Sequence, residues 1–186
     1  MTQERTSKQF QSGKKLQTQI LDGVNKLADI VGSTLGPKGR NVLLHKKGTN
    51  PIITKDGVTV ARFIDFENPF ENAGAQLIKQ AASQTANSAG DGTTTSTILT
   101  RAILNSAQKY VSAGVSPIEL KRGMDKGLEA IVGRLEKVSR PIESQEDIEH
   151  IAAISANNDR SIGKLISMAV EQAGHDGSVS VEDGKS

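Results

Sequence analysis

The stretch Gly90-Asp91-Gly92-Thr93-Thr94-Thr95 joins two segments with helical periodicity, residues 68–89 and residues 93–112. Glycine lacks a Cβ, so the two glycines allow a tight turn and the close approach of a ligand. The threonines open the second helix, whose first N–H groups have no partners within the helix. Those N–H groups and the helix dipole favour an anion, and Asp91 adds a hard oxygen ligand suited to Mg²⁺. The sequence predicts a phosphate site at this turn.

A helix N-cap is the alternative interpretation of the same residues, because Asp and Thr are common before a helix. A cap needs only one side-chain oxygen, whereas this stretch has three consecutive hydroxyls, those of Thr93, Thr94 and Thr95. The run of threonines therefore favours the phosphate site.

Composition narrows the class of protein. The 186 residues are 35% hydrophobic and 24% charged, as in soluble globular proteins, and only 3% are aromatic, which favours packed helices over a β-sandwich. The net charge of +2 forms no basic stripe, so we expect no nucleic-acid partner. The absence of cysteine excludes disulfides and thiolate metal sites. No signal core or membrane-length apolar run occurs, so we expect a cytoplasmic protein without a membrane partner.

Hydrophobic periodicity predicts a mostly α fold with a small β hairpin. A helix begins near Leu16 and stops at Gly36-Pro37, and short strands at 41–44 and 52–54 form the hairpin. Asp56 is placed to cap a brief helix over 58–62. The two long helices at 68–89 and 93–112 are expected to turn Phe70, Ala73, Leu77, Ile78, Ala81, Ile98, Leu99, Ala102, Ile103 and Tyr110 inward.

A third long helix starts at Ser116-Pro117, with proline at its favoured N-terminal position. Arg140-Pro141 ends it and marks the best candidate domain boundary. Beyond it we expect a helix capped by Ser144, a second short helix over 159–173, and a strand at Val179–Val181. That strand has no visible partner nearby, so its partner is expected beyond residue 186 or in another chain.

Two further loops have polar residues on tight turns. Thr34-Leu35-Gly36-Pro37-Lys38-Gly39-Arg40 follows the first helix, and Thr54-Lys55-Asp56-Gly57 follows the second strand. Taken alone, a glycine C-cap explains the first loop and a common Asp-Gly turn explains the second. Neither has the GxxxxGK[ST] spacing of a Walker A loop.

Five segments in this order and spacing closely resemble the group I chaperonins of the GroEL type, over a region from about Phe10 to the last residue. The segments are TLGPKGRNV at 34–42, ITKDGVTVAR at 53–62, AGDGTTTSTIL at 89–99, LKRGMDKG at 120–127 and ISANND at 154–159. The resemblance implies a chaperonin that hydrolyses ATP and assists protein folding and refolding.

The resemblance also implies roles for single residues. Asp91 would coordinate Mg²⁺, Asp56 would assist hydrolysis near the γ-phosphate, and K⁺ is a further candidate cation. The ATP-binding positions would be Thr34, Leu35, Gly36, Pro37, Lys55, Asp91, Gly92, Thr93, Thr94 and Thr95.

The resemblance divides the chain into residues 1–137, the N-terminal part of a helical equatorial ATP-binding domain, and residues 138–186, the ascending part of an α+β hinge (intermediate) domain. The apical domain, which binds unfolded polypeptide and co-chaperonin in the family, would be absent, and so would part of the ATP pocket. Other subunits of a ring are the implied partners, and an organellar matrix is the implied location if a targeting segment has been removed. The alternative is a truncated, inactive ring-interaction fragment, so whether this chain is itself an enzyme stays open.

Overall fold

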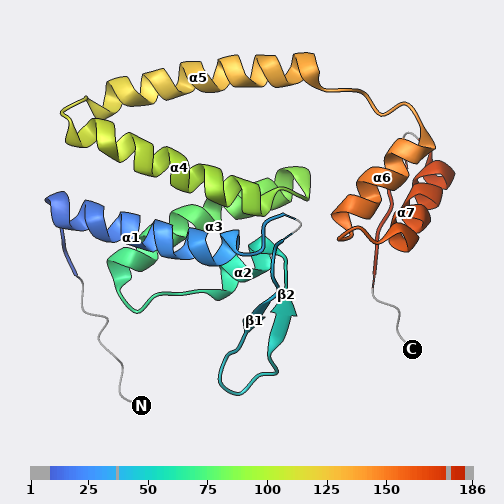
Figure 1. Ribbon diagram of the computed structural model, residues 1–186, viewed down its shortest axis with the longest axis horizontal. Helices are drawn as coiled ribbons and strands as arrows, with labels where there is room; N and C mark the ends of the chain where they lie inside the picture. The colour runs from blue at the N-terminus through green and yellow to red at the C-terminus, as the bar shows by residue number, and fades with distance from the viewer. Residues whose placement is uncertain (1–8, 37, 175–176, 183–186) are drawn as a thin grey trace. The chain divides into compact units, whose positions relative to one another are not determined.

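The computed structural model describes residues 9–36, 38–174 and 177–182 (Figure 1). The fold is mostly helical with one small hairpin, as the sequence predicts. In chain order the elements are α1 (Gly13–Gly32), β1 (Val42–Leu44), β2 (Ile52–Thr54), α2 (Gly57–Phe63), α3 (Pro69–Ala89), α4 (Thr93–Ser112), α5 (Pro117–Val138), α6 (Gln145–Ser155) and α7 (Arg160–Ala173).

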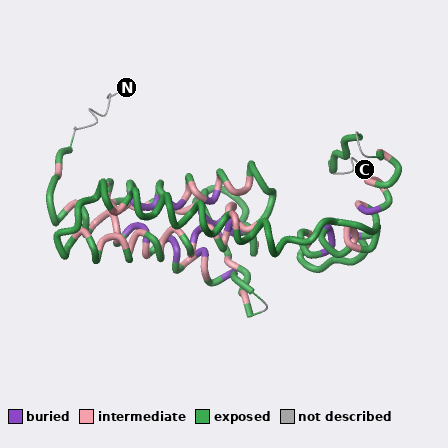
Figure 2. The backbone as a smooth tube through the Cα atoms, turned by 90° about the horizontal axis from the view of Figure 1, so that it is seen from above, coloured by how far each residue is buried: buried purple, intermediate pink, exposed green. Residues whose placement is uncertain are grey.

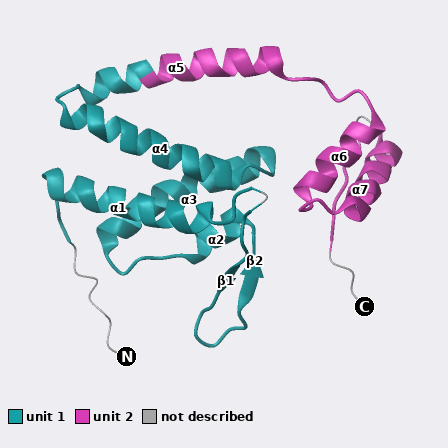
Figure 3. Cartoon of the chain, in the orientation of Figure 1, with its two compact units in different colours: residues 1–123 teal, residues 124–186 magenta. Residues whose placement is uncertain are grey.

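The chain forms two compact units, residues 1–123 and residues 124–186 (Figure 3). The division between them falls within α5, whereas the sequence places a candidate boundary after that helix, at Arg140-Pro141, and the family resemblance implies one between residues 137 and 138. The assignment of domains on either side of that boundary remains a prediction.

The core of the first unit is built on α1. Val24, Leu27, Ala28 and Val31 recur at helical spacing and are all fully buried, so one stripe of α1 faces inward. Burial of a side chain such as Leu27 is worth about 1.5–3 kcal/mol. The other members of this core are Leu44, Val60, Ala61, Ala75 and Ile78. Figure 2 shows the buried residues in purple along the tube.

The crossing of α1 and α3 brings the two backbones into contact. A Cβ on Gly23 would lie 1.8 Å from the carbonyl oxygen of Glu71, and a Cβ on Gly74 would lie 2.0 Å from that of Ile20. Neither position can hold a side chain without moving a helix, so the two glycines determine how closely α1 approaches α3.

The hairpin pairs Val42 with Thr54 and Leu44 with Ile52 in antiparallel register. Leu44 lies in the core, whereas Leu43 is 61% exposed and Ile53 is 65% exposed. Alternate residues of a strand point to opposite faces, which accounts for this difference. From the end of the hairpin the chain continues to Asp56, which directly precedes α2.

The faces that α3 and α4 bury differ from the prediction. Leu77, Leu99, Ile103 and Tyr110 are between 41% and 57% exposed instead of inward. The buried residues of α3 are Gly74, Ala75, Ile78 and Ala82, and those of α4 are Thr93 and Thr97. Ile78 is buried as predicted, and the other buried residues of the two helices are small ones, which permit the closest helix approach.

None of the residues of α5 is buried. Its apolar stripe includes side chains between 43% and 62% exposed: Met124, Leu128, Ile131, Leu135 and Val138. Among the described residues, no helix combines the length and the apolar character needed to cross a membrane.

The second unit contains an α6–α7 hairpin. Ser144 caps α6 as predicted, and its hydroxyl and the Asp147 carboxylate form a reciprocal capping box. Asn157 and Asn158 adopt left-handed conformations in the connection to α7, which asparagine tolerates better than most residues. The segment expected to be a strand, Val179–Val181, forms no ladder with any described residue.

Candidate functional site

The turn between α3 and α4 has the geometry that its glycines suggest. Gly90 ends α3 with φ of 73°, and Gly92 precedes α4 with φ of 81°, both in the left-handed region. The N-cap of α4 is Gly92, which has no side chain, and Asp91 accepts a 2.6 Å hydrogen bond from the Gly92 N–H through Oδ1. Asp91 therefore does not bind the N–H groups of the first turn of α4, contrary to the N-cap alternative.

The N-terminal N–H groups of α4 are available to a ligand. Side chains of Asp56, Asn68, Ser144 and Asp159 cap α2, α3, α6 and α7, whereas α4 has no side-chain cap. In the part of the chain that the structure describes, the N–H groups of residues 93–95 donate to no protein acceptor. An anion is the natural partner for such groups.

The threonines of this turn differ in exposure. Thr93 is buried, Thr94 is half-buried and Thr95 is exposed. The hydroxyl of Thr97, which is fully buried, donates to the Thr93 carbonyl at 2.9 Å, and that of Ser96 donates to the same oxygen at 3.0 Å. These hydrogen bonds stabilise the first turn of α4 on its buried side, and the hydroxyls on its outer side stay accessible to a ligand.

The loop after α1 meets this turn. Thr34 is buried, its hydroxyl donates to the Val31 carbonyl at 2.7 Å, and its Oγ1 lies 3.4 Å from Oγ1 of Thr94. The loop is closed by hydrogen bonds from Gly39 N–H to Gly36 O and from Arg40 N–H to Ser33 O.

The structure describes only some of the other loop residues that were predicted to bind ATP. Leu35 and Gly36 are exposed, and Pro37 lies outside the described residues. The C-cap of α1 is Ser33, so the glycine C-cap alternative does not explain Gly36.

The third loop, which leads into α2, lies at the same turn before α4. Asp56 caps α2 by accepting from the N–H groups of Thr59 at 2.8 Å and Val58 at 3.4 Å. A Cβ on the next residue, Gly57, would lie 2.2 Å from Oγ1 of Thr94, so the N-termini of α2 and α4 are in contact. Nothing in the sequence singles out Gly57 for this role, because Asp-Gly turns are common.

Three loops that are distant in sequence therefore converge at Thr34, Gly57 and Thr94. The neighbouring Asp56, Lys55 and Asp91 side chains are all exposed. No group of three or more His, Cys, Asp or Glu residues among the described ones could hold a metal by itself. Mg²⁺ commonly takes one or two carboxylates and completes its shell with phosphates and water, so a single Asp91 beside a phosphate seat fits this ion.

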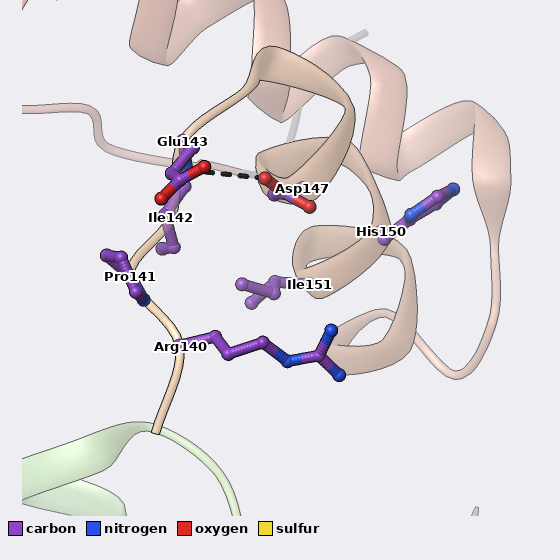
Figure 4. Close-up of a pocket in the computed structure, with 7 residues that line it drawn as sticks. All are labelled: Arg140, Pro141, Ile142, Glu143, Asp147, His150 and Ile151. Atoms are coloured by element: carbon purple, nitrogen blue, oxygen red, sulfur yellow. Dashed lines mark hydrogen bonds between the residues drawn. The ribbon is translucent and has the colours of Figure 1, made fainter. Parts of the chain in front are cut away.

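A separate hollow of about 430 Å³ lies in the second unit (Figure 4). The Glu143 N–H donates to Oδ2 of Asp147 at 3.2 Å along one side of it. Hydrogen bonds from the Ser144 hydroxyl, and then from the Glu143 N–H, lower the pKa of the Asp147 carboxyl below its ordinary value of 3.8. The hollow is lined by Arg140, Pro141, Ile142, Glu143, Asp147, His150 and Ile151. No motif in the sequence points to it.

The chain matches known proteins in both sequence and structure. Residues 27–185 match the family model described as the TCP-1/cpn60 chaperonin family. The chain is also similar to chaperonin gp146 from the bacteriophage EL 2 (Pseudomonas aeruginosa), crystallised in the presence of ATP-BeFx, at 30% identity. The TM-scores are 0.69 and 0.70 for the two crystal forms. This match covers 84% of the chain and 28% of the phage protein.

A group III chaperonin in the open state has the same fold, with a TM-score of 0.71 at 24% identity. That match covers 85% of the chain and 32% of the longer protein, so the chain spans about a third of such relatives or less. The family match extends over most of the 186 residues. The chain belongs to the TCP-1/cpn60 chaperonin family.

Proposed function

We propose that this chain supplies the phosphate- and magnesium-binding loops of an ATP-dependent chaperonin of the group I type, which assists protein folding. The convergence of Thr34, Gly57 and Thr94 carries the proposal, because it gathers the three loops whose sequences resemble nucleotide-binding segments. The phage relative, crystallised with ATP-BeFx, supports nucleotide as the ligand.

Each loop would make a different contribution to the site. The N–H groups and hydroxyls of residues 93–95 would bind phosphate oxygens, and Thr34, Leu35, Gly36 and Pro37 would contribute further contacts to the nucleotide. The Lys55 ammonium would add positive charge beside them. Asp91 would hold Mg²⁺, which neutralises charge on the phosphates and fixes their orientation.

Asp56 would orient the attacking water near the γ-phosphate. In the structure both of its carboxylate oxygens accept hydrogen bonds from the first turn of α2. The Thr59 hydroxyl also donates to Oδ2. Each carboxylate oxygen has two lone pairs, so Oδ2 is fully used, and Oδ1, which accepts from the Val58 N–H, keeps acceptor capacity for a water molecule. The cap fixes the direction of the carboxylate, which favours the positioning role.

The proposal for the whole protein follows the family. Residues 1–137 would belong to an equatorial ATP-binding domain and residues 138–186 to a hinge domain, in a cytoplasmic ring of like subunits. Unfolded polypeptides and a co-chaperonin would bind through an apical domain, with ATP binding and ADP release driving the hinge.

A second candidate is a ring-interaction fragment that does not turn over ATP. The exposed apolar side chains on α4 and α5 favour it, because patches of this kind mark association surfaces. The two candidates differ in nucleotide chemistry.

Calorimetric titration with ATP in the presence and absence of Mg²⁺, followed by a phosphate-release assay, separates them. On the protein at its natural length, magnesium-dependent binding with release of phosphate is expected for the first candidate. Binding without turnover favours the second, and the absence of binding refutes the ATP site.

A further inference from the structure

Polar side chains connect α1 and α4 along one line. Gln108 Nε2 donates to Gln17 Oε1 at 3.2 Å, and the amides of Asn25 and Asn105 bond to each other at 2.7 and 3.4 Å. Arg101 forms an ion pair with Asp29. Residue numbers rise along α1 as they fall along α4, so the helices are antiparallel. We call these three pairs the polar seam.

The seam restrains how α4 can slide along α1. The buried residues of α4 are Thr93 and Thr97, and Leu104 packs partly buried against the core, so apolar burial alone gives α4 limited axial specificity. The amide of Asn105 also donates to the Arg101 carbonyl at 3.0 Å, which fixes its orientation toward Asn25. A slide of one residue along a helix is about 1.5 Å, enough to break such directional bonds.

The seam leads directly to the candidate phosphate site. Arg101 lies seven residues after Thr94, about two turns of helix, so the two side chains share one face of α4. On the other side, Asp29 lies five residues before Thr34. An axial shift at the ion pair would therefore also move Thr94 relative to Thr34.

We propose that the polar seam positions the first turn of α4 against the Thr34 loop, so that Asn25, Asn105, Asp29 and Arg101 are positioning residues for nucleotide binding. This inference rests on the proposed ATP site. A misplacement of about 1 Å at a reacting group can cost roughly 100-fold in rate, so a distant pair that controls register affects affinity and turnover.

Charge exchange at the ion pair provides the first test. Asp29→Arg and Arg101→Asp alone place like charges together, and we expect each to weaken magnesium-ATP binding by roughly three- to tenfold. The double exchange restores an ion pair with opposite polarity and should recover most of the affinity. Calorimetry measures affinity, and urea unfolding measures stability in parallel.

A matched control is available in the same unit. Asp65 pairs with Lys79 at 2.8 Å, and its side chain is 69% exposed, close to the 73% of Asp29. Asp65→Arg should lower stability comparably and leave ATP affinity within about twofold. Equal losses of affinity at equal stability in Asp29→Arg and Asp65→Arg would overturn the positioning role.

A second test measures register without nucleotide. The 186 residues contain no cysteine, so Lys15→Cys and Leu99→Cys, both at exposed positions, place spin labels on α1 and α4 alone. Labelled chain is diluted with unlabelled chain to suppress distances between molecules. Asn105→Ala should shift or broaden the distance distribution, and an unchanged distribution contradicts the proposal.

Different results would refute the proposed function and the positioning role. If the chain without substitutions binds no magnesium-ATP, the proposed function fails and the positioning role falls with it. If that chain binds ATP while the seam variants lose no more affinity than Asp65→Arg, only the positioning role is overturned.

Discussion

The hydroxyls of Thr34 and Thr94, which are 60 residues apart in sequence, lie 3.4 Å from each other. This contact joins the end of α1 to the start of α4, and Gly57 at the start of α2 touches the same threonine. Three separate chain segments therefore meet at one site, and the predictions about the site depend on this arrangement.

Asp91→Asn tests the metal ligand. Asparagine keeps an oxygen that can accept from the Gly92 N–H, while the charge that Mg²⁺ requires is lost. We expect magnesium-dependent ATP hydrolysis, measured on the protein at its natural length, to fall by far more than tenfold, or well over about 1.4 kcal/mol of transition-state stabilisation. Turnover close to that of the unsubstituted protein would reject Asp91 as the ligand.

Asp56 requires two substitutions, because the structure assigns it a capping role in addition to the proposed one. Asp56→Asn keeps an acceptor for the Thr59 N–H, whereas Asp56→Ala removes the cap at a cost of about 0.5–2 kcal/mol. If Asp56 orients water, both variants should lower kcat while ATP affinity measured by calorimetry stays nearly intact. A large loss of affinity in Asp56→Asn would make Asp56 a metal ligand or a structural residue instead.

Gly74→Ala tests the backbone contact between α1 and α3. The new Cβ would meet the Ile20 carbonyl at 2.0 Å, so we expect destabilisation of roughly 1–3 kcal/mol in urea unfolding. Gly123→Ala is the control, since apart from its own turn of helix no atom lies within 4 Å of its Cβ position and it gains up to about 1 kcal/mol of helix propensity. Opposite signs for the two substitutions are the expected result, and equal signs would argue against the close crossing.

The capping box of α6 predicts an acid-sensitive helix. The pKa of Asp147 is lowered by the Ser144 hydroxyl and the Glu143 N–H, so folding favours the ionised carboxylate. Its stabilising contribution is complete above the ordinary pKa of 3.8 and is lost as the pH falls through the lowered folded-state value. Chemical shifts of residues 145–155 should therefore show loss of helix below about pH 4.

Asp147→Asn should remove most of that pH response in α6. The carboxyl of Asp159 also has a lowered pKa, caused mainly by the Ser161 hydroxyl, so the start of α7 should respond in the same pH range. A response of α6 in Asp147→Asn equal to that of the unsubstituted chain would show that other groups control it.

The apolar stripe of α5 predicts self-association of the 186-residue chain. Leu128 is 62% exposed, Ile131 is 60% exposed and Leu135 is 58% exposed, all on one helix. We expect light scattering after size-exclusion chromatography to give a mass that rises with concentration, and Ile131→Lys to reduce it. A single monomeric mass at all concentrations would contradict this prediction.

Local signals in the sequence predicted much of the fold. The hairpin, the caps at Asp56 and Ser144, and the turn at Gly90 and Gly92 depend on neighbouring residues, and the structure confirms them. The inward faces of α3 and α4 were predicted incorrectly at Leu77 and other positions, because periodicity identifies an apolar face but not what covers it.

Contacts between residues that are far apart in the sequence could not be predicted from the spacing of residues along the chain. The pairs Asn25–Asn105 and Asp29–Arg101 are separated by 80 and 72 residues, and each side chain alone resembles an ordinary exposed polar residue. The three loops of the candidate site could each be recognised, but their meeting at Thr94 depends on how three helices pack. The hollow beside Arg140 has no sequence motif because shape alone defines it.

The contact between Gly57 and Thr94 has a mechanical consequence. Gly57 has no side chain, and the hydroxyl oxygens of Thr94 and Thr93 lie close to where its Cβ would be, so the starts of α2 and α4 have little room to move toward each other. A displacement of Thr94 toward α2 would meet Gly57 directly and would so reach the adjacent residue, Asp56. We therefore expect a shift of the first turn of α4 and a shift of Asp56 to accompany each other.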